Sequence, residues 1–158
     1  MVNKPHDVVC KELVINASQH RTFQAFTEQI DLWWPKSHHI GKSEMKRAVL
    51  ETKEGGRWYE IGADGSECDW GRVLVWSPPR KLILAWQITA EWRYDPNFLT
   101  EVEVNFIEQG PDHTRLTLEH RNIEKFGVKA EEIWSAFDSD GGWTGILKAF
   151  ANLAESRA

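Results

Sequence analysis

Hydrophobic and polar residues alternate over much of the chain, which is typical of strands with one buried face. The alternation is clearest between residues 100 and 121. Val102, Val104 and Phe106 share one side of their segment, and Leu116 and Leu118 continue the same pattern in the next segment, followed in phase by a histidine. Charged and polar residues fill the alternate positions. The sequence therefore predicts a sheet with one buried face and one face in water.

Seven segments carry a strand pattern. The first spans residues 8–15, and the other six follow between residues 46 and 121, separated by turn clusters such as Asp64-Gly65 and Ser77-Pro78-Pro79. These six span residues 46–52, 56–62, 68–76, 81–88, 100–107 and 114–121. Short strands joined by short turns favour an antiparallel meander.

Helical patterns lie on either side of these six strands. Ser18 is a plausible N-cap for a short helix with apolar residues at helical spacing, and Pro35 ends this region. Near the C-terminus, Trp143, Ile146, Leu147, Phe150, Leu153 and Ala154 follow the spacing of an amphipathic helix. The expected fold is α+β: a curved antiparallel sheet of about seven strands, one N-terminal and then six, wrapped around a long C-terminal helix, with two short helices after the first strand.

Length and charge limit the classes of protein that the chain can represent. Its 158 residues are expected to form a single domain over 1–158. The net charge of −5 argues against a general nucleic-acid or anionic-membrane surface. No apolar run approaches the roughly 18 residues needed to cross a bilayer, and the first residues lack the apolar stretch of a signal peptide. Cys10 and Cys68 are too few for a disulfide scaffold. A cytoplasmic location is expected.

Several segments together resemble a known family. They span residues 25–35, 54–65, 70–87, 100–106, 114–121 and 141–154, for example EGGRWYEIGADG and GGWTGILKAFANLA. In this order they are similar to the SRPBCC superfamily, which includes START-like proteins, and more narrowly to its branch named for activators of the 90-kDa heat-shock-protein ATPase (AHSA-type).

The resemblance implies a helix-grip fold whose sheet and long helix enclose a ligand-binding cavity. Members of the superfamily bind lipids, sterols or aromatic natural products, and some are cyclases, aromatases or dehydratases. From the resemblance a chaperone partner is possible, and with it a role in the stress response. The sequence itself does not support that partner, because the eukaryotic activators carry an additional N-terminal domain for much of the chaperone contact and these 158 residues are expected to leave none for it.

Nine tryptophans are unusual for a chain of this length. A small domain has room for few such side chains in a dry core, so several are expected to line the cavity, although core packing is the alternative for each one. Trp70 and Trp76 can face either side of the sheet. The predicted ligand-binding set is Trp34, Trp58, Tyr59, Trp86, Val102, Val104, Leu118, His120, Trp143 and Leu147.

His120 is the candidate catalytic residue, because it shares the buried face with Leu116 and Leu118. It could act as a general base or orient a ligand, and a purely structural hydrogen bond is the alternative. His38 and His39 lie in a loop that could gate the cavity. Since the histidines are scattered, no metal and no cofactor are predicted.

The remaining carboxylates and glycines give weaker evidence for a catalytic or nucleotide-binding site. Glu101 and Glu103 share the solvent face of their strand, whereas Glu60 cannot be placed from the pattern. The glycines between residues 141 and 145 lack the βαβ context of a nucleotide site and are expected to relieve crowding where the helix meets the sheet.

Three functions follow from this reading. The preferred one is a binding protein for a small hydrophobic or aromatic molecule. The alternatives are an enzyme of the cyclase, dehydratase or hydrolase type and a co-chaperone that stimulates a heat-shock-protein ATPase. Exposed edge strands also allow a homodimer.

Overall fold

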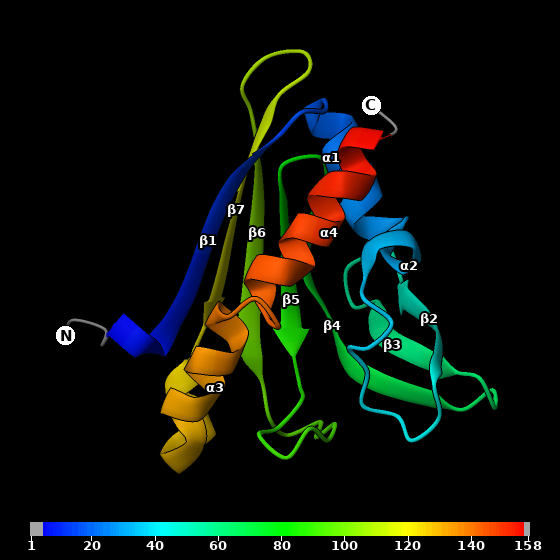
Figure 1. Cartoon of the computed structure of the whole chain (residues 1–158), viewed down its shortest axis with the longest axis vertical. Coiled ribbons are helices and arrows are strands. Elements are labelled where there is room, and N and C mark those ends of the chain that lie inside the picture. The colour runs from blue at the N-terminus through cyan, green and yellow to red at the C-terminus, as the bar shows by residue number, and fades with distance from the viewer. Residues whose placement is uncertain (1–4, 157–158) are drawn as a thin grey trace.

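The alternating segments form one seven-stranded antiparallel sheet in the computed structural model, which describes residues 5–156 (Figure 1). The strand order is β1-β7-β6-β5-β4-β3-β2, so the first strand pairs with the last and every other pair joins neighbours along the chain. The strands are β1 Val8–Ile15, β2 Met45–Leu50, β3 Arg57–Gly62, β4 Glu67–Ser77, β5 Lys81–Trp86, β6 Thr100–Glu108 and β7 Thr114–Arg121.

The helices cover the concave face of this sheet. The longest helix, α4, crosses the sheet diagonally and packs against α1 and α2 near its C-terminal half, while α3 lies near its start (Figure 1). The α-helices are α1 Gln19–Thr27, α2 Ile30–Trp33, α3 Ala130–Asp138 and α4 Trp143–Ser156, and two 3-10 segments are η1 Pro5–Asp7 and η2 Ile123–Lys129. None of the helices in the described range is long and apolar enough to span a membrane.

The predicted α+β helix-grip fold is confirmed. The strand expected at 114–121 is observed over those residues, and Ser18 caps α1 by accepting a hydrogen bond from the backbone N–H of Arg21 at 3.1 Å. The sequence pattern did not predict η2 and α3. Both are short, and Gly127, with φ of 65°, interrupts the helical periodicity inside η2.

A β-bulge in β4 decides the orientation of Trp70. Trp58 of β3 pairs with Gly71 and the next residue, Tyr59, pairs with Asp69, so Trp70 is the extra residue on β4. A bulge redirects a side chain and increases local twist. Gly71 permits it, because a Cβ at that position would lie 1.7 Å from the carbonyl oxygen of Ala85. Trp70 consequently faces the interior, where it is 2% exposed.

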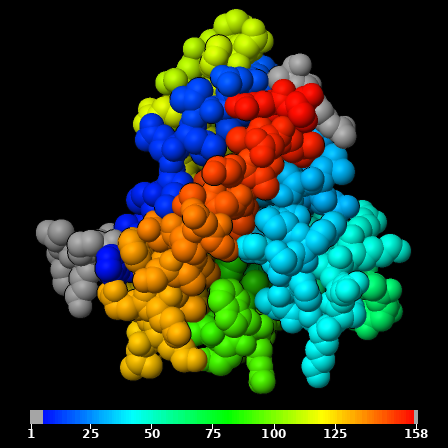
Figure 2. Space-filling model, in the orientation of Figure 1, coloured from blue at the N-terminus to red at the C-terminus, as the bar shows by residue number. Residues whose placement is uncertain are grey.

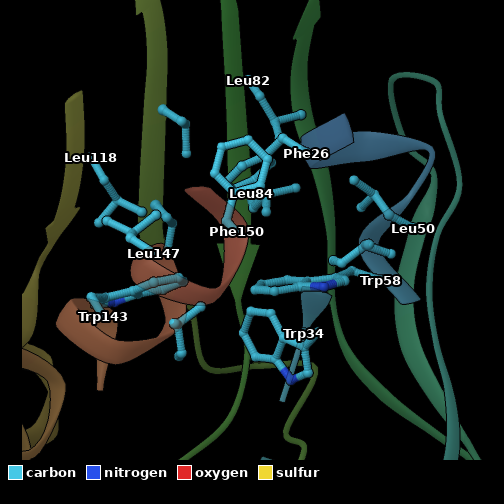
Figure 3. Close-up of a cluster of buried hydrophobic side chains, with 14 of the residues drawn as sticks. Phe26, Trp34, Leu50, Trp58, Leu82, Leu84, Leu118, Trp143, Leu147 and Phe150 are labelled. Atoms are coloured by element: carbon cyan, nitrogen blue, oxygen red, sulfur yellow. The ribbon is translucent and has the colours of Figure 1, made fainter. Parts of the chain in front are cut away.

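The core is aromatic on the side of the sheet that faces α4. Phe150 of α4 and Phe26 of α1 pack with ring centroids 5.1 Å apart, and Trp33 contacts Phe150 at the same distance. Trp34, Trp58 and Trp143 continue this layer towards the other end of the sheet (Figure 3). The helix grip is thus held by contacts between α4, the short N-terminal helices and the sheet.

Candidate functional site

A cavity of about 460 Å³ opens where three connecting segments meet. These are the loop after α2, the β5–β6 connection and the junction of α3 with α4, which surround a hollow on the face shown in Figure 2. Five tryptophans line it: Trp34, Trp70, Trp86, Trp92 and Trp143. Phe137, Ile88 and Ile146 extend the apolar wall, and polar residues gather at the mouth. A pocket of this size and composition suits a small, mainly apolar molecule.

Three members of the predicted ligand-binding set, Trp34, Trp86 and Trp143, line this cavity. Trp58 lies behind them, 1% exposed, with its ring edge-on to those of Trp34 and Trp86 at 5.9 and 5.8 Å. The aliphatic members are core residues away from the cavity: Val102, Val104, Leu118 and Leu147 are each at most 3% exposed.

Tyr59 differs most from its expected position. Burial alternates along β3, so Trp58 and Glu60 face the interior while Tyr59 is half-buried on the opposite face. There the guanidinium of Arg57 lies over its ring, 3.8 Å from the centroid. The phase of the strand therefore places Tyr59 outside the cavity.

His120 is fully buried and acts as a support for the cavity wall. Its Nδ1 accepts a hydrogen bond from Trp143 Nε1 at 3.1 Å, so in the neutral ring Nε2 carries the hydrogen and donates to Thr100 Oγ1 at 2.8 Å. Its ring also stacks on Phe137 at 4.7 Å. Burial lowers the pKa of His120 to about 3, so the imidazole is neutral near pH 7.

These contacts do not bring His120 to the cavity as the sequence pattern suggested. It touches three lining residues, Trp86, Phe137 and Trp143, from behind, and both of its ring nitrogens have protein partners. This geometry matches the structural alternative for His120, in which the imidazole orients the wall.

Trp92 and Phe137 are lining residues that the sequence reading did not single out. Trp92 lies in the β5–β6 connection with a backbone φ of 60°, a conformation that is uncommon for a bulky residue. Its side chain remains 48% exposed and lies 6.4 Å from Phe137 between ring centroids. Backbone strain of this kind often marks ligand-contacting positions. Nothing in the periodicity of the sequence signals either residue, because neither belongs to a predicted element.

The buried tryptophans of the cavity present ring surfaces, because their indole N–H groups have protein acceptors. Trp34 donates to the carbonyl oxygen of His38 at 2.9 Å, Trp86 to that of Ile88 at 3.2 Å, and Trp143 to His120. Trp70 donates to Glu60 Oε1 at 2.8 Å. The walls can therefore stack on a flat ligand without offering it further hydrogen-bond donors.

The loop after α2 reaches across the mouth of the cavity. His38 Nε2 donates to the carbonyl oxygen of Gly141 at 2.7 Å, which joins this loop to the α3–α4 junction. The sharp turn at that junction requires Gly142, since a Cβ there would lie 2.3 Å from the carbonyl oxygens of Ala136 and Phe137. The crowding relieved by this glycine is thus with α3, whereas the sequence reading expected it against the sheet.

Glu60 anchors the same loop from below. Its carboxylate is 1% exposed and accepts hydrogen bonds from the backbone N–H groups of Ile40, at 2.6 Å, and Gly41, at 3.1 Å, as well as from Trp70. His39 Nδ1 lies 3.8 Å from Glu60 Oε2. One buried side chain therefore positions both the loop and a tryptophan of the cavity wall.

Replacing Glu60 with Gln is expected to destabilise the protein by about 1–3 kcal/mol, because an amide NH₂ would replace one acceptor oxygen and face a donor. Urea denaturation at pH 7 would measure the loss. Glu67→Gln, a change on the exposed part of β4, is the control and should alter stability by less than about 0.5 kcal/mol. Equal stabilities of the two variants would show that Glu60 does not anchor the loop.

The fold and the cavity define a helix-grip protein of the SRPBCC type. The model of the family "Activator of Hsp90 ATPase homolog 1-like protein" matches residues 16–155, so the chain belongs to this family. Among curated proteins, none matches the chain significantly.

Several solved structures are similar to the chain, and two of them are more than 25% identical to it. The chain is 36% identical to the anthrahydroquino-gamma-pyrone synthase Txn09, covering 95% of this chain and 99% of Txn09, with a TM-score of 0.67. It is 28% identical to CalC, a self-sacrificing resistance protein from Micromonospora echinospora, covering 97% of both chains, with a TM-score of 0.73. A protein from Mesorhizobium loti shares the fold at 17% identity, with a TM-score of 0.68 over 96% of this chain and 98% of its own.

Proposed function

We propose that this chain is a cytosolic binding protein that holds a small, flat, hydrophobic or aromatic molecule between the sheet and the C-terminal helix. The observation that carries the proposal is the wall of five tryptophans around a cavity of about 460 Å³. Since the indole N–H groups of the four buried wall tryptophans have protein acceptors, the cavity offers mainly ring faces for stacking. The ligand contacts assigned to Trp34, Trp86 and Trp143 are part of this proposal, and Trp70 and Trp92 join them.

A second candidate, an enzyme that closes or rearranges a ring in such a molecule, is favoured by the 36% identity to the synthase Txn09. CalC, described as a resistance protein, is also similar along nearly its whole length. Similarity at this level therefore accompanies different activities, and fold alone does not choose between them. A catalyst needs convergent polar groups within reach of the ligand, and in this cavity the histidines at the mouth are the nearest candidates.

Tryptophan fluorescence during titration with fatty acids, sterols, flavones and aromatic acids tests the binding proposal. We expect a saturable change with flat aromatic compounds. Trp92→Ala should weaken binding about three- to tenfold, because it removes one stacking surface. It should change stability little, since its side chain is 48% exposed.

Trp134→Phe is the matched control, since Trp134 lies outside the cavity and donates to the carbonyl oxygen of Val8. Its affinity for the same compounds should be that of the wild type. If a folded sample responds to no compound, the binding proposal fails, and stimulation of a purified heat-shock-protein ATPase becomes the next assay.

A further inference from the structure

The polar groups at the mouth of the cavity already donate their hydrogens to protein acceptors. Because the carbonyl oxygen of Gly141 can only accept, the hydrogen of the neutral His38 ring lies on Nε2. His38 Nδ1 therefore carries a lone pair and accepts the hydroxyl hydrogen of Ser37, whose Oγ is 3.0 Å away. Ser139 Oγ donates to the carbonyl oxygen of Ala136 at 2.7 Å. These side chains present acceptor atoms to a ligand.

His39 completes this pattern with an acceptor that has no partner among the residues that the structure describes. Its Nδ1 lies 3.0 Å from the carbonyl oxygen of Gly41, which again can only accept, so in the neutral ring Nδ1 carries the hydrogen and Nε2 the lone pair. Within residues 5–156, no group bonds to His39 Nε2. The side chain lines the cavity and is 26% exposed.

Glu60 holds His39 in this orientation. It binds the backbone N–H groups of Ile40 and Gly41, the two residues that follow His39, and its Oε2 lies 3.8 Å from the protonated Nδ1. The negative charge behind Nδ1 favours the tautomer with the lone pair on Nε2. The acceptor is thus preorganised before a ligand arrives, which limits the entropy lost on binding.

From this arrangement we infer that the cavity selects ligands carrying a hydrogen-bond donor at their outer end, and that His39 Nε2 accepts that hydrogen bond. The inference rests on the proposed binding function. The favoured class is a flat aromatic molecule with a free hydroxyl, such as a phenol, whose rings stack on the tryptophans. A ligand with an ether or ketone oxygen at the same place binds more weakly. That oxygen can only accept a hydrogen bond, and it would face His39 Nε2, which also can only accept, so both atoms would stay unpaired.

Calorimetric titration with 7-hydroxyflavone and 7-methoxyflavone tests this selectivity, since the two differ only by a methyl group in place of the hydroxyl hydrogen. The wild type should bind 7-hydroxyflavone about tenfold more tightly. His39→Leu should remove that difference by weakening 7-hydroxyflavone alone, while His39→Gln, which retains an acceptor oxygen, should restore part of it. His113→Leu removes an exposed imidazole from the β6–β7 turn, outside the cavity, and is the control; it should leave the ratio of the two affinities unchanged.

The possible failures are distinguishable. If neither flavone binds the wild type, the proposed binding function fails. If both bind with equal affinity, or if His39→Leu weakens both by the same factor, the function stands and the hydroxyl selectivity of His39 is wrong. Thermal unfolding of each variant would verify that the comparison is made on folded protein.

Discussion

Acidification from pH 7 to pH 4 is expected to cost the wild-type protein about 3 kcal/mol of stability through His120 alone. Burial lowers the pKa of this imidazole from 6.5 to about 3 in the folded protein. Between these two values the unfolded chain binds a proton that the folded protein does not bind, so protons favour unfolding. This contribution is absent above about pH 6.5, grows as the pH falls, and levels off below about pH 3.

The measurement is the free energy of unfolding by urea at intervals between pH 7.5 and pH 3.5, for the wild type and for His120→Gln. A glutamine can still accept from Trp143 and donate to Thr100, and it has no proton to gain in this range. The difference between the two curves isolates the histidine from the carboxylates, which titrate in both proteins. Parallel curves would show that His120 has the same pKa in the folded and unfolded protein, which contradicts its burial.

Trp143→Ala is expected to destabilise the protein by about 3–5 kcal/mol. Trp143 is 2% exposed at the start of α4, so truncation leaves a void next to Trp34 and Trp86, whose ring centroids are each 6.1 Å from its own. It also leaves His120 Nδ1 without its donor. A buried acceptor without a partner adds to the cost of the lost packing.

Trp92→Ala is the matched comparison, because Trp92 lines the same cavity but is 48% exposed. Its loss should cost less than about 1 kcal/mol in the same denaturation experiment. The contrast separates a tryptophan that supports the cavity from one that serves the ligand. Similar losses in both variants would mean that the β5–β6 connection is part of the core.

The parts of the fold that could be predicted are those where local pattern and tertiary packing agree. β6 and β7 alternate strictly, and each lies between two other strands, so burial follows the sequence pattern. The amphipathic spacing after Trp143 likewise predicts α4. In both places most solvent-facing side chains are polar, Ile107 of β6 being an exception, and this contrast favours one orientation of each element.

The orientation of Trp70 could not be predicted, because β4 contains two irregularities. Register shifts next to Trp58 in β3 and between Val73 and Val75 in β4 change the phase of the strand, and neither leaves a signal in the hydrophobic pattern. Gly71 is the visible trace of the first bulge. Why this position requires a glycine becomes clear only in the structure, where the carbonyl oxygen of Ala85 on β5 occupies the place of a Cβ.

The mouth of the cavity was harder still to predict, since it joins segments distant in the chain. His38 and Gly141 are 103 residues apart, and Glu60 reaches Ile40 of the loop from strand β3. A gating role for the loop with His38 and His39 could be suggested from its position, but the hydrogen-bond acceptors that it presents depend on these long-range partners. Glu60 looks like any other strand carboxylate until its three donors are identified.

The most direct test of the account is the ¹H–¹⁵N spectrum of the nine indole N–H groups during titration with 7-hydroxyflavone, assigned with single Trp→Phe variants. We expect saturable shifts for the five cavity tryptophans, with Trp76 and Trp134, which do not line the cavity, nearly unchanged. Shifts confined to Trp76 and Trp134, or uniform small shifts without saturation, would contradict a ligand site between the sheet and the C-terminal helix.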